Sequence, residues 1–221
     1  MMRKLLYSGS PFARRVRVVL LEKGLDFEPD FHDGFRPIEA ISPHNPALRV
    51  PVLYDGDRHL FGSALILHYL FQEYPTNPPH PADPPLAPTI TRASRHWDDM
   101  LILTAIEAMA DAVFAMRLHL SAGTIEAPYA ARQRARITAC LDWLEQRITP
   151  QGFWPEVFSV MDLNLMCALL WGEARGAIKF RTGQWPKIVA MTDRWQSRPS
   201  LLVTPITTPP VSASPQPPTP A

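Results

Sequence analysis

The residues best suited to chemistry form a serine-proline pair near the start of the chain. Residues 8–17 read Ser-Gly-Ser-Pro-Phe-Ala-Arg-Arg-Val-Arg and follow a short apolar run at residues 5–7. Ser10 is a favoured N-cap type, and Pro11 suits the first helical position, where a missing N–H costs nothing. A helix N-terminus carries unpaired N–H groups and about half a positive charge, so it stabilises a phosphate, a carboxylate or a thiolate. The Ser10 hydroxyl is placed to donate to such an anion.

The same serine has a simpler interpretation, in which Ser10 does no more than cap its own helix. A lone Ser-Pro pair is most often a plain cap. The choice between a cap and an anion site therefore depends on the elements around Ser10 and on the rest of the chain.

Composition excludes several classes of partner. The 221 residues are 46% hydrophobic and 19% charged, and the formal net charge of +1 gives no reason to expect nucleic acid or a membrane surface. Cys140 and Cys167 have no CxxC partner, and neither they nor the histidines show metal-type spacing, so we expect no metal. Few cysteines, no signal-peptide pattern and no apolar run of membrane-spanning length together predict a cytoplasmic protein.

The first 75 residues alternate between strand and helix patterns. The expected elements, in order, are a strand at 5–7, a helix from Pro11 to a Lys-Gly stop at 23–24, strands at 26–31, 50–54 and 58–61, and a helix at 62–74. An Asp-Gly-Asp turn joins the last two strands. Residues 32–49 hold several prolines, so we expect them to be irregular or to contain only a short helix.

Two clusters among the 25 prolines divide the chain. Residues 75–88 and residues 205–221 hold seven prolines each, and Pro-rich stretches do not enter helix interiors or central strands. The first cluster predicts a linker and the second a disordered tail. The predicted organisation is a mixed α/β domain at 1–75, a linker at 76–88, an all-helical domain at 89–200 and a tail at 201–221.

The region after the linker is helical in pattern almost throughout. Helices are expected at about 89–120, 127–148, 159–172 and 186–196. Ser159-Val-Met-Asp162 has the S-x-x-D spacing of a capping box at the start of the third of these helices. We expect Asp162 to help that helix fold rather than to catalyse.

Four segments, in this order and spacing, resemble the cytosolic glutathione S-transferase superfamily. They are the catalytic turn and first helix at residues 6–24, Asn-Pro-Ala-Leu-Arg-Val-Pro-Val-Leu at 45–53, Phe-Gly-Ser-Ala-Leu-Ile-Leu-His-Tyr-Leu at 61–70, and the capping box at 159–162. The resemblance covers about residues 3–200. It implies an α/β N-terminal thioredoxin-like domain that binds glutathione, followed by an all-α C-terminal helical bundle domain.

The resemblance also implies a role for each matching position. Ser10 would donate to the sulfur of glutathione, the Val50 N–H and C=O would pair with its cysteinyl unit, and Ser63 would cap its helix and hold the γ-glutamyl carboxylate. Pro51 is a candidate for a cis peptide bond, and Arg49 for a contact with the glycyl carboxylate. Each also has a plainer interpretation, as a proline that starts a strand, an N-cap or a solvated arginine.

Two departures from the family pattern bear on function. Omega-like relatives carry cysteine where Ser10 stands and transfer thiols, whereas residues 1–75 contain no cysteine, so we expect conjugation as in the theta- and zeta-like branches. Gly62 replaces the acidic residue or glutamine that usually helps hold the γ-glutamyl end. Asp98 or Asp99 could compensate from across a dimer interface, or could form a solvated helix face.

We therefore predict a homodimeric glutathione S-transferase that activates the thiol of its co-substrate glutathione for attack on a small hydrophobic electrophile. Lowering a thiol pKa of about 8.5 by two units needs about 2.7 kcal/mol of thiolate stabilisation, and raises the thiolate fraction at pH 7 from about 3% to about 75%. Two alternatives stay open. One is a non-catalytic binding or regulatory protein of the same fold, which Gly62 favours, and the other is a specialised glutathione-dependent isomerase, lyase or dehalogenase.

Overall fold

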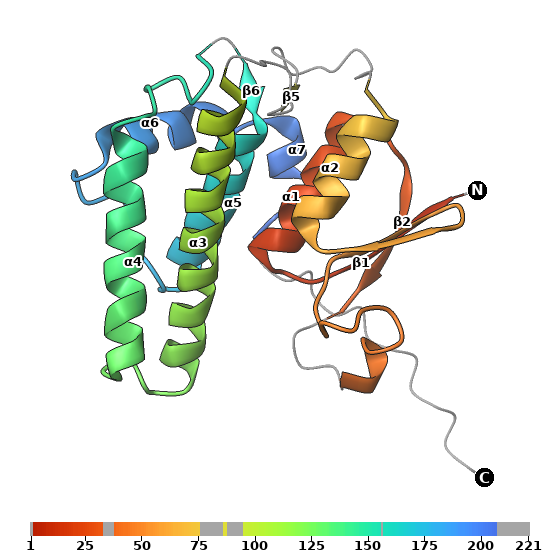
Figure 1. Cartoon of the computed structure of the whole chain (residues 1–221), viewed down its shortest axis with the longest axis horizontal. Coiled ribbons are helices and arrows are strands. Elements are labelled where there is room, and N and C mark those ends of the chain that lie inside the picture. The colour runs from red at the N-terminus through yellow and green to blue at the C-terminus, as the bar shows by residue number, and fades with distance from the viewer. Residues whose placement is uncertain (1, 33–37, 76–85, 88–94, 156, 207–221) are drawn as a thin grey trace.

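A four-stranded sheet with two helices on one face forms the first part of the chain (Figure 1). The structure is a computed structural model that describes residues 2–32, 38–75, 86–87, 95–155 and 157–206. The elements of this part are β1 (Arg3–Tyr7), α1 (Pro11–Glu22), β2 (Phe27–Phe31), a 3₁₀ turn (Ile38–Ala40), β3 (Val52–Asp55), β4 (Arg58–Phe61) and α2 (Ser63–Glu73). Their order confirms the sequence prediction.

The strands lie in the order β2-β1-β3-β4. β1 pairs parallel with β2 through the α1 crossover, whereas β3 pairs antiparallel with both β1 and β4. The β-α-β crossover places α1 against the sheet, where Val16, Val19 and Leu20 are fully buried. The sheet edge that carries Ser10 is therefore held by a buried helix.

The second part of the chain is helical and lies beside α1 and α2 (Figure 1). Its elements are β5 (Leu86–Ala87), α3 (His96–Ser121), α4 (Pro128–Glu145), β6 (Phe158–Ser159), α5 (Val160–Ala174), α6 (Pro186–Trp195) and α7 (Pro199–Leu202). Together with the sheet, these helices confirm the predicted fold class. The sequence did not predict the short parallel pairing of β5 with β6.

The capping box at the start of α5 is present as predicted. The Ser159 hydroxyl accepts from the Asp162 N–H at 3.2 Å, and the Asp162 carboxylate accepts from the Ser159 N–H at 2.9 Å and from the Phe153 N–H at 3.0 Å. Burial raises the pKa of Asp162 to about 6. The contacts of this carboxylate with Ser159 and Phe153 hold the start of α5 in place.

The C-terminal boundary extends beyond the predicted helical domain. Leu201 is 2% exposed and Thr204 is fully buried, so residues 201–206 belong to the fold rather than to a tail. Their backbone carbonyls accept from Arg14 of α1, at 3.1 Å from Leu201 and 2.7 Å from Thr204. Residues 207–221, and most of the linker predicted at 76–88, lie outside the described residues.

Candidate functional site

Three neighbouring strands bring the predicted site residues to one edge of the sheet. Leu6 of β1 pairs with Val52 of β3, and Val52 pairs in turn with Phe61 of β4. The turn with Ser10 follows the end of β1, Pro51 precedes β3, and Ser63 follows β4. Segments that are far apart in sequence therefore meet at one edge.

Ser10 is the N-cap of α1. Its hydroxyl oxygen accepts from the Ala13 N–H at 3.1 Å, and its own N–H donates to the Ser8 hydroxyl at 3.3 Å. A hydroxyl has one proton and two acceptor lone pairs, so capping leaves the Ser10 proton available to donate. The plain cap and the anion site are therefore compatible in the half-buried Ser10.

A loop fixed by Asn45 carries Arg49 and Val50. Asn45 is 2% exposed, and its side chain donates to the Arg49 carbonyl at 2.7 Å and accepts from the Ala47 N–H at 2.8 Å. The Val50–Pro51 peptide bond is cis, as predicted. The loop leaves Arg49 exposed and Val50 partly exposed at the sheet edge.

Ser63 does not cap α2, which corrects the prediction. The N-cap is Gly62, whose φ of 85° lies in the left-handed region that favours glycine, and Ser63 is the first helical residue. Ser63 is only 6% exposed, and its hydroxyl oxygen accepts from an Arg15 guanidinium nitrogen at 2.6 Å. Gly62 itself is exposed, and a Cβ added there would meet nothing within 4 Å.

An ion pair between α1 and α3 lies next to the Ser63 hydroxyl. Arg15 of α1 is 3% exposed and pairs through both terminal nitrogens with Glu107 of α3, one of these bonds measuring 3.1 Å. The same Arg15 nitrogen donates to Ser63 and to Glu107. The sequence reading missed this role for both residues, because they lie 92 positions apart and no local pattern links them.

Helix α3 brings further charges near this edge. Burial, followed by the Glu107 carboxylate, raises the pKa of Asp111, while Arg49, Arg15 and Arg136 oppose the rise. The edge itself combines the N-termini of α1 and α2 with Arg15 and the exposed Arg49.

Aromatic side chains lie beside the Ser10 turn. The Trp171 indole N–H donates to the Gly9 carbonyl at 2.7 Å, and its ring stacks on Phe114 with centroids 5.5 Å apart. Phe12 meets Phe114 edge-on at 6.3 Å. Phe12, Phe114 and Trp171 thus form an aromatic surface beside the turn that carries Ser10.

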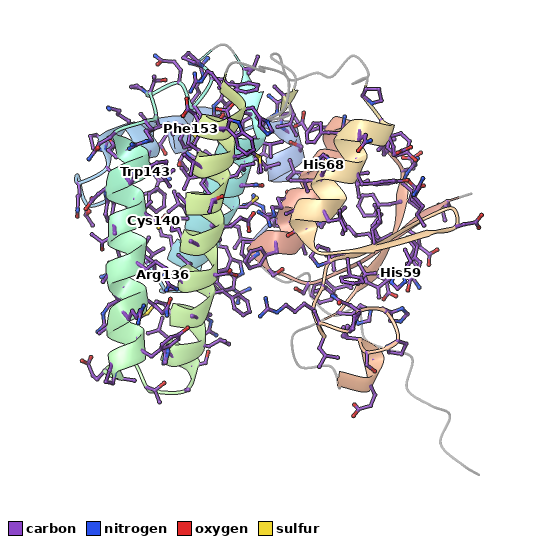
Figure 2. The ribbon with its side chains drawn as sticks, in the orientation of Figure 1. His59, His68, Arg136, Cys140, Trp143 and Phe153 are labelled. Carbon is purple, nitrogen blue, oxygen red and sulfur yellow. The ribbon has the colours of Figure 1, made fainter. Side chains whose placement is uncertain are left out.

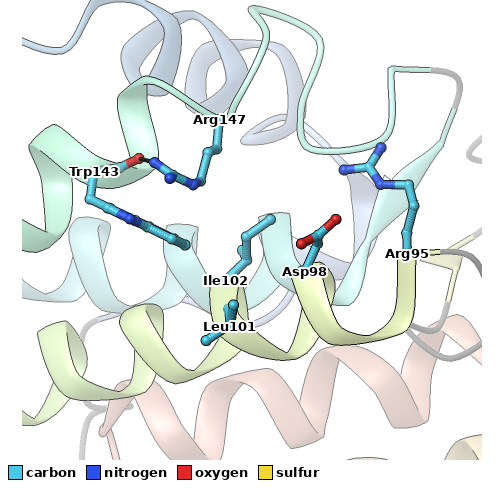
Figure 3. A pocket seen from close by; sticks show the side chains of 6 residues that line it. All are labelled: Arg95, Asp98, Leu101, Ile102, Trp143 and Arg147. Carbon is cyan, nitrogen blue, oxygen red and sulfur yellow. Dashed lines mark hydrogen bonds between the residues drawn. The ribbon is translucent and has the colours of Figure 1, made fainter.

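Asp98 and Asp99 do not lie at Ser63. Asp98 lines a groove of about 320 Å³ between α3 and α4, together with Arg95 and Trp143 (Figure 3). Asp99 is fully buried and pairs with Arg95 at 3.9 Å, so it does not reach across a dimer interface while it stays in the core. A role for Asp98 across a dimer stays a prediction.

Within the described ranges, no three or more His, Cys, Asp or Glu side chains are grouped so as to hold a metal ion. In that same part of the chain, no helix combines the length and apolarity needed to cross a membrane. Both cysteines are free thiols, and burial raises the pKa of Cys140 and of the fully buried Cys167.

Comparison with known proteins agrees with this architecture. Residues 6–79 match the sequence model of the glutathione S-transferase N-terminal domain. The chain is 37% identical over 81 residues to a stringent starvation protein A homolog from Coxiella burnetii, and 42% identical over 81 residues to glutathione S-transferase 1 from Dianthus caryophyllus. These alignments cover 36% and 35% of this chain, but only 39% and 36% of the two relatives.

A solved structure extends the likeness to the whole fold. A glutathione S-transferase from Methylobacillus flagellatus with glutathione bound superposes with a TM-score of 0.76 at 24% identity, covering 91% of this chain and 98% of the other. The described residues therefore share the fold of glutathione S-transferases. Residues 6–79, about a third of the chain, resemble the glutathione S-transferase N-terminal domain in sequence, and the likeness over the rest of the described chain is one of fold.

Proposed function

We propose that this chain is a glutathione S-transferase whose tripeptide lies along the sheet edge from Ser10 to Ser63. The main support is the register of the sheet, which places the end of β1, the start of β3 and the end of β4 side by side. Three adjacent strands span about 10 Å, and an extended tripeptide is about 10 Å long. One glutathione therefore fits along the three segments.

Each segment offers the chemistry that one part of glutathione needs. The Ser10 hydroxyl donates a hydrogen bond to the sulfur. The cysteinyl unit pairs with the backbone of Val50 as an added strand would. The free N–H groups of α2 and the Ser63 hydroxyl bind the γ-glutamyl carboxylate, with the Arg15 cation behind them. Exposed Arg49 attracts the glycyl carboxylate.

The catalytic step is activation of the bound thiol. The sulfur stands at the N-terminus of α1, where the helix dipole and the Ser10 O–H favour the thiolate over the thiol. The thiolate then attacks an electrophilic carbon, and the leaving group or the adjacent atom takes up the displaced electron pair. The aromatic surface of Phe12, Phe114 and Trp171 suits a small hydrophobic electrophile.

A homodimer forms part of this proposal. Large apolar side chains stand exposed on α2 and at the start of α3, with Leu65 53%, Trp97 78% and Leu101 57% exposed. A second copy would remove such surface from water. Size-exclusion chromatography with light scattering tests this assembly, and a monomeric mass at micromolar concentration would contradict it.

A non-catalytic binding protein of the same fold is the second candidate. Gly62 supports it because glycine leaves the γ-glutamyl end without the usual acidic side chain or glutamine. The likeness of residues in the first domain to a stringent starvation protein A homolog points the same way. A specialised isomerase, lyase or dehalogenase would use the same edge and differ only in its electrophile.

Calorimetric titration with glutathione, followed by a chlorodinitrobenzene conjugation assay, separates these candidates. We expect the wild type to bind and conjugate, Ser10→Ala to bind but to lose up to about 100-fold in rate, and Ser10→Thr to recover most of it, because threonine keeps both hydroxyl and cap. No binding at millimolar glutathione would refute the transferase. Binding without conjugation favours the binding protein or a specialised enzyme with another electrophile, and an unchanged rate in Ser10→Ala removes Ser10 from the mechanism.

A further inference from the structure

A second cavity lies between the domains, away from the Ser10 turn. It is a groove of about 410 Å³ with walls from α2 and α3 and a floor from α5. Its lining is mainly apolar and includes Leu67, Phe71, Leu103 and Val160. His68 of α2, labelled in Figure 2, also lines the groove. A volume of this size and an apolar lining are typical of small-molecule sites.

One polar atom in this groove lacks a partner. Asn164 is 5% exposed, and its side-chain oxygen has no hydrogen-bond partner among the described residues. Buried polar atoms in folded proteins are nearly always paired, and an unpaired acceptor carries a desolvation penalty. An N–H or O–H group of a ligand in the groove would remove that penalty.

The groove is distinct from the aromatic surface beside Ser10. Asn164 precedes Trp171 by seven residues on α5, and Thr104 precedes Phe114 by ten residues on α3. At 1.5 Å per residue these separations are about 10 Å and about 15 Å. Glu107 lines the groove and pairs with Arg15 of α1, so this ion pair lies between the groove and the aromatic surface.

Charge in the groove selects the kind of occupant. The carboxylate of Glu107 is the acidic group of the lining, and its pair with Arg15 already compensates its charge. An anionic ligand would face this carboxylate, and a cation would compete with Arg15 for it. A neutral molecule avoids both costs.

From the cavity, its lining and the unpaired acceptor, we infer that the groove between α2, α3 and α5 is a second binding site. Its ligand is a small, neutral, mainly apolar molecule with one N–H or O–H donor, which bonds to the Asn164 side-chain oxygen. This site lies apart from the aromatic surface beside Ser10, adjoins the Arg15–Ser63 contact at Glu107, and does not depend on the transferase proposal.

Indole and 1-methylindole are suitable probes, because they have nearly the same shape and only indole carries an N–H donor. Calorimetry and saturation-transfer NMR on the full chain should show saturable indole binding at millimolar concentration or below, and about tenfold weaker binding of 1-methylindole. Asn164→Leu should bring indole down to the level of 1-methylindole. Equal binding of the two probes to the wild type would overturn the assignment of Asn164.

Two further variants locate the probe. Thr104→Trp places a large ring in the groove from an exposed position of α3 and should abolish indole binding, whereas Leu118→Trp, an exposed position of α3 outside the groove, should not. Phe114→Ala should also leave indole binding unchanged. Loss of binding in Phe114→Ala but not in Thr104→Trp would place indole beside Ser10 and refute the second site. Absence of saturable indole binding refutes the second site as well. This holds also where the cause is a second copy of the chain that covers the groove.

Discussion

Replacing Glu107 by glutamine tests whether the Arg15–Glu107 pair stabilises the contact between the two domains. Glutamine keeps one acceptor oxygen and nearly the same shape, but it removes the negative charge. Arg15 is 4% exposed at its side chain, so its cation would stay buried with only Ser63 and a neutral amide as partners. The variant therefore isolates the charge from the packing.

The cost of Glu107→Gln in free energy of unfolding depends on how deeply the pair is buried and on how many hydrogen bonds join it. Two bonds join the pair, and hydrogen bonds to charged groups are worth about 1.5–3 kcal/mol. Breaking a fully buried pair costs about 3–5 kcal/mol, but the Glu107 side chain is 32% exposed, so the cost is lower. We expect Glu107→Gln to reduce the free energy of unfolding by about 2 kcal/mol, and the melting temperature by about 4–8 °C.

The matched background is Arg15→Met, which removes the buried cation and leaves a side chain of similar length. In that background Glu107→Gln should cost less than about 0.5 kcal/mol, because Glu107 then has no cation to neutralise. Urea unfolding is followed by circular dichroism for the whole chain and by tryptophan fluorescence for the helical part, since all six tryptophans lie after residue 96. Equal costs of Glu107→Gln in the two backgrounds would refute the reasoning.

Three further outcomes follow from the same geometry. Ser63→Ala should weaken glutathione binding about tenfold by calorimetry on the folded variant, and should also lower the melting temperature because the buried Arg15 loses an acceptor; unchanged affinity would remove Ser63 from the tripeptide edge. The pKa of Asp162 in the folded protein is about 6, above its ordinary value of 3.8, so between these pH values the native state holds a proton that the unfolded chain has lost. The contribution of Asp162 to the free energy of unfolding therefore falls by about 3 kcal/mol as pH rises from about 4 to 6. Unfolding of Asp162→Asn should lack that slope, and identical slopes in the two proteins would contradict the assignment. Trp171→Phe removes the donor to the Gly9 carbonyl and should lower the conjugation rate severalfold, whereas an unaltered rate would show that this bond does not position the turn.

Local signals in the sequence were sufficient for the elements and for the cap of the first helix. Ser10 with Pro11, and Ser159 with Asp162, are patterns of a few residues whose geometry is complete within one helical turn. The roles of Ser10, Val50 and Ser63 toward glutathione stay predictions.

The cap of α2 was misplaced because serine is a better N-cap type than glycine when only residue type is considered. The backbone at Gly62 instead adopts a φ of 85°, and this shifts Ser63 into the first turn, where Arg15 reaches its hydroxyl. Nothing local to residues 61–64 indicates that partner.

The remaining errors concern contacts between segments far apart in the chain. Asp99 looked like part of a solvated face, because helical periodicity alone does not show that α4 and α5 both pack on α3. Proximity to prolines predicts a tail at residues 201–206, but Arg14 of α1 donates to the carbonyls of Leu201 and Thr204. Periodicity reports which residues share a face, whereas tertiary packing decides what covers that face.

These distant contacts converge on α1, the helix whose N-terminus carries Ser10. Three of its charged side chains, Arg14, Arg15 and Glu22, are buried, and each bonds to the helical part of the chain. Glu22 receives two 2.7 Å bonds from Arg198. Charged groups are rarely buried unless they are paired, so the bonds from the helical part of the chain are what allow these side chains of α1 to be buried. The position of the Ser10 hydroxyl is thus set jointly by the sheet, through β1, and by α3 and α7, through the charges of α1.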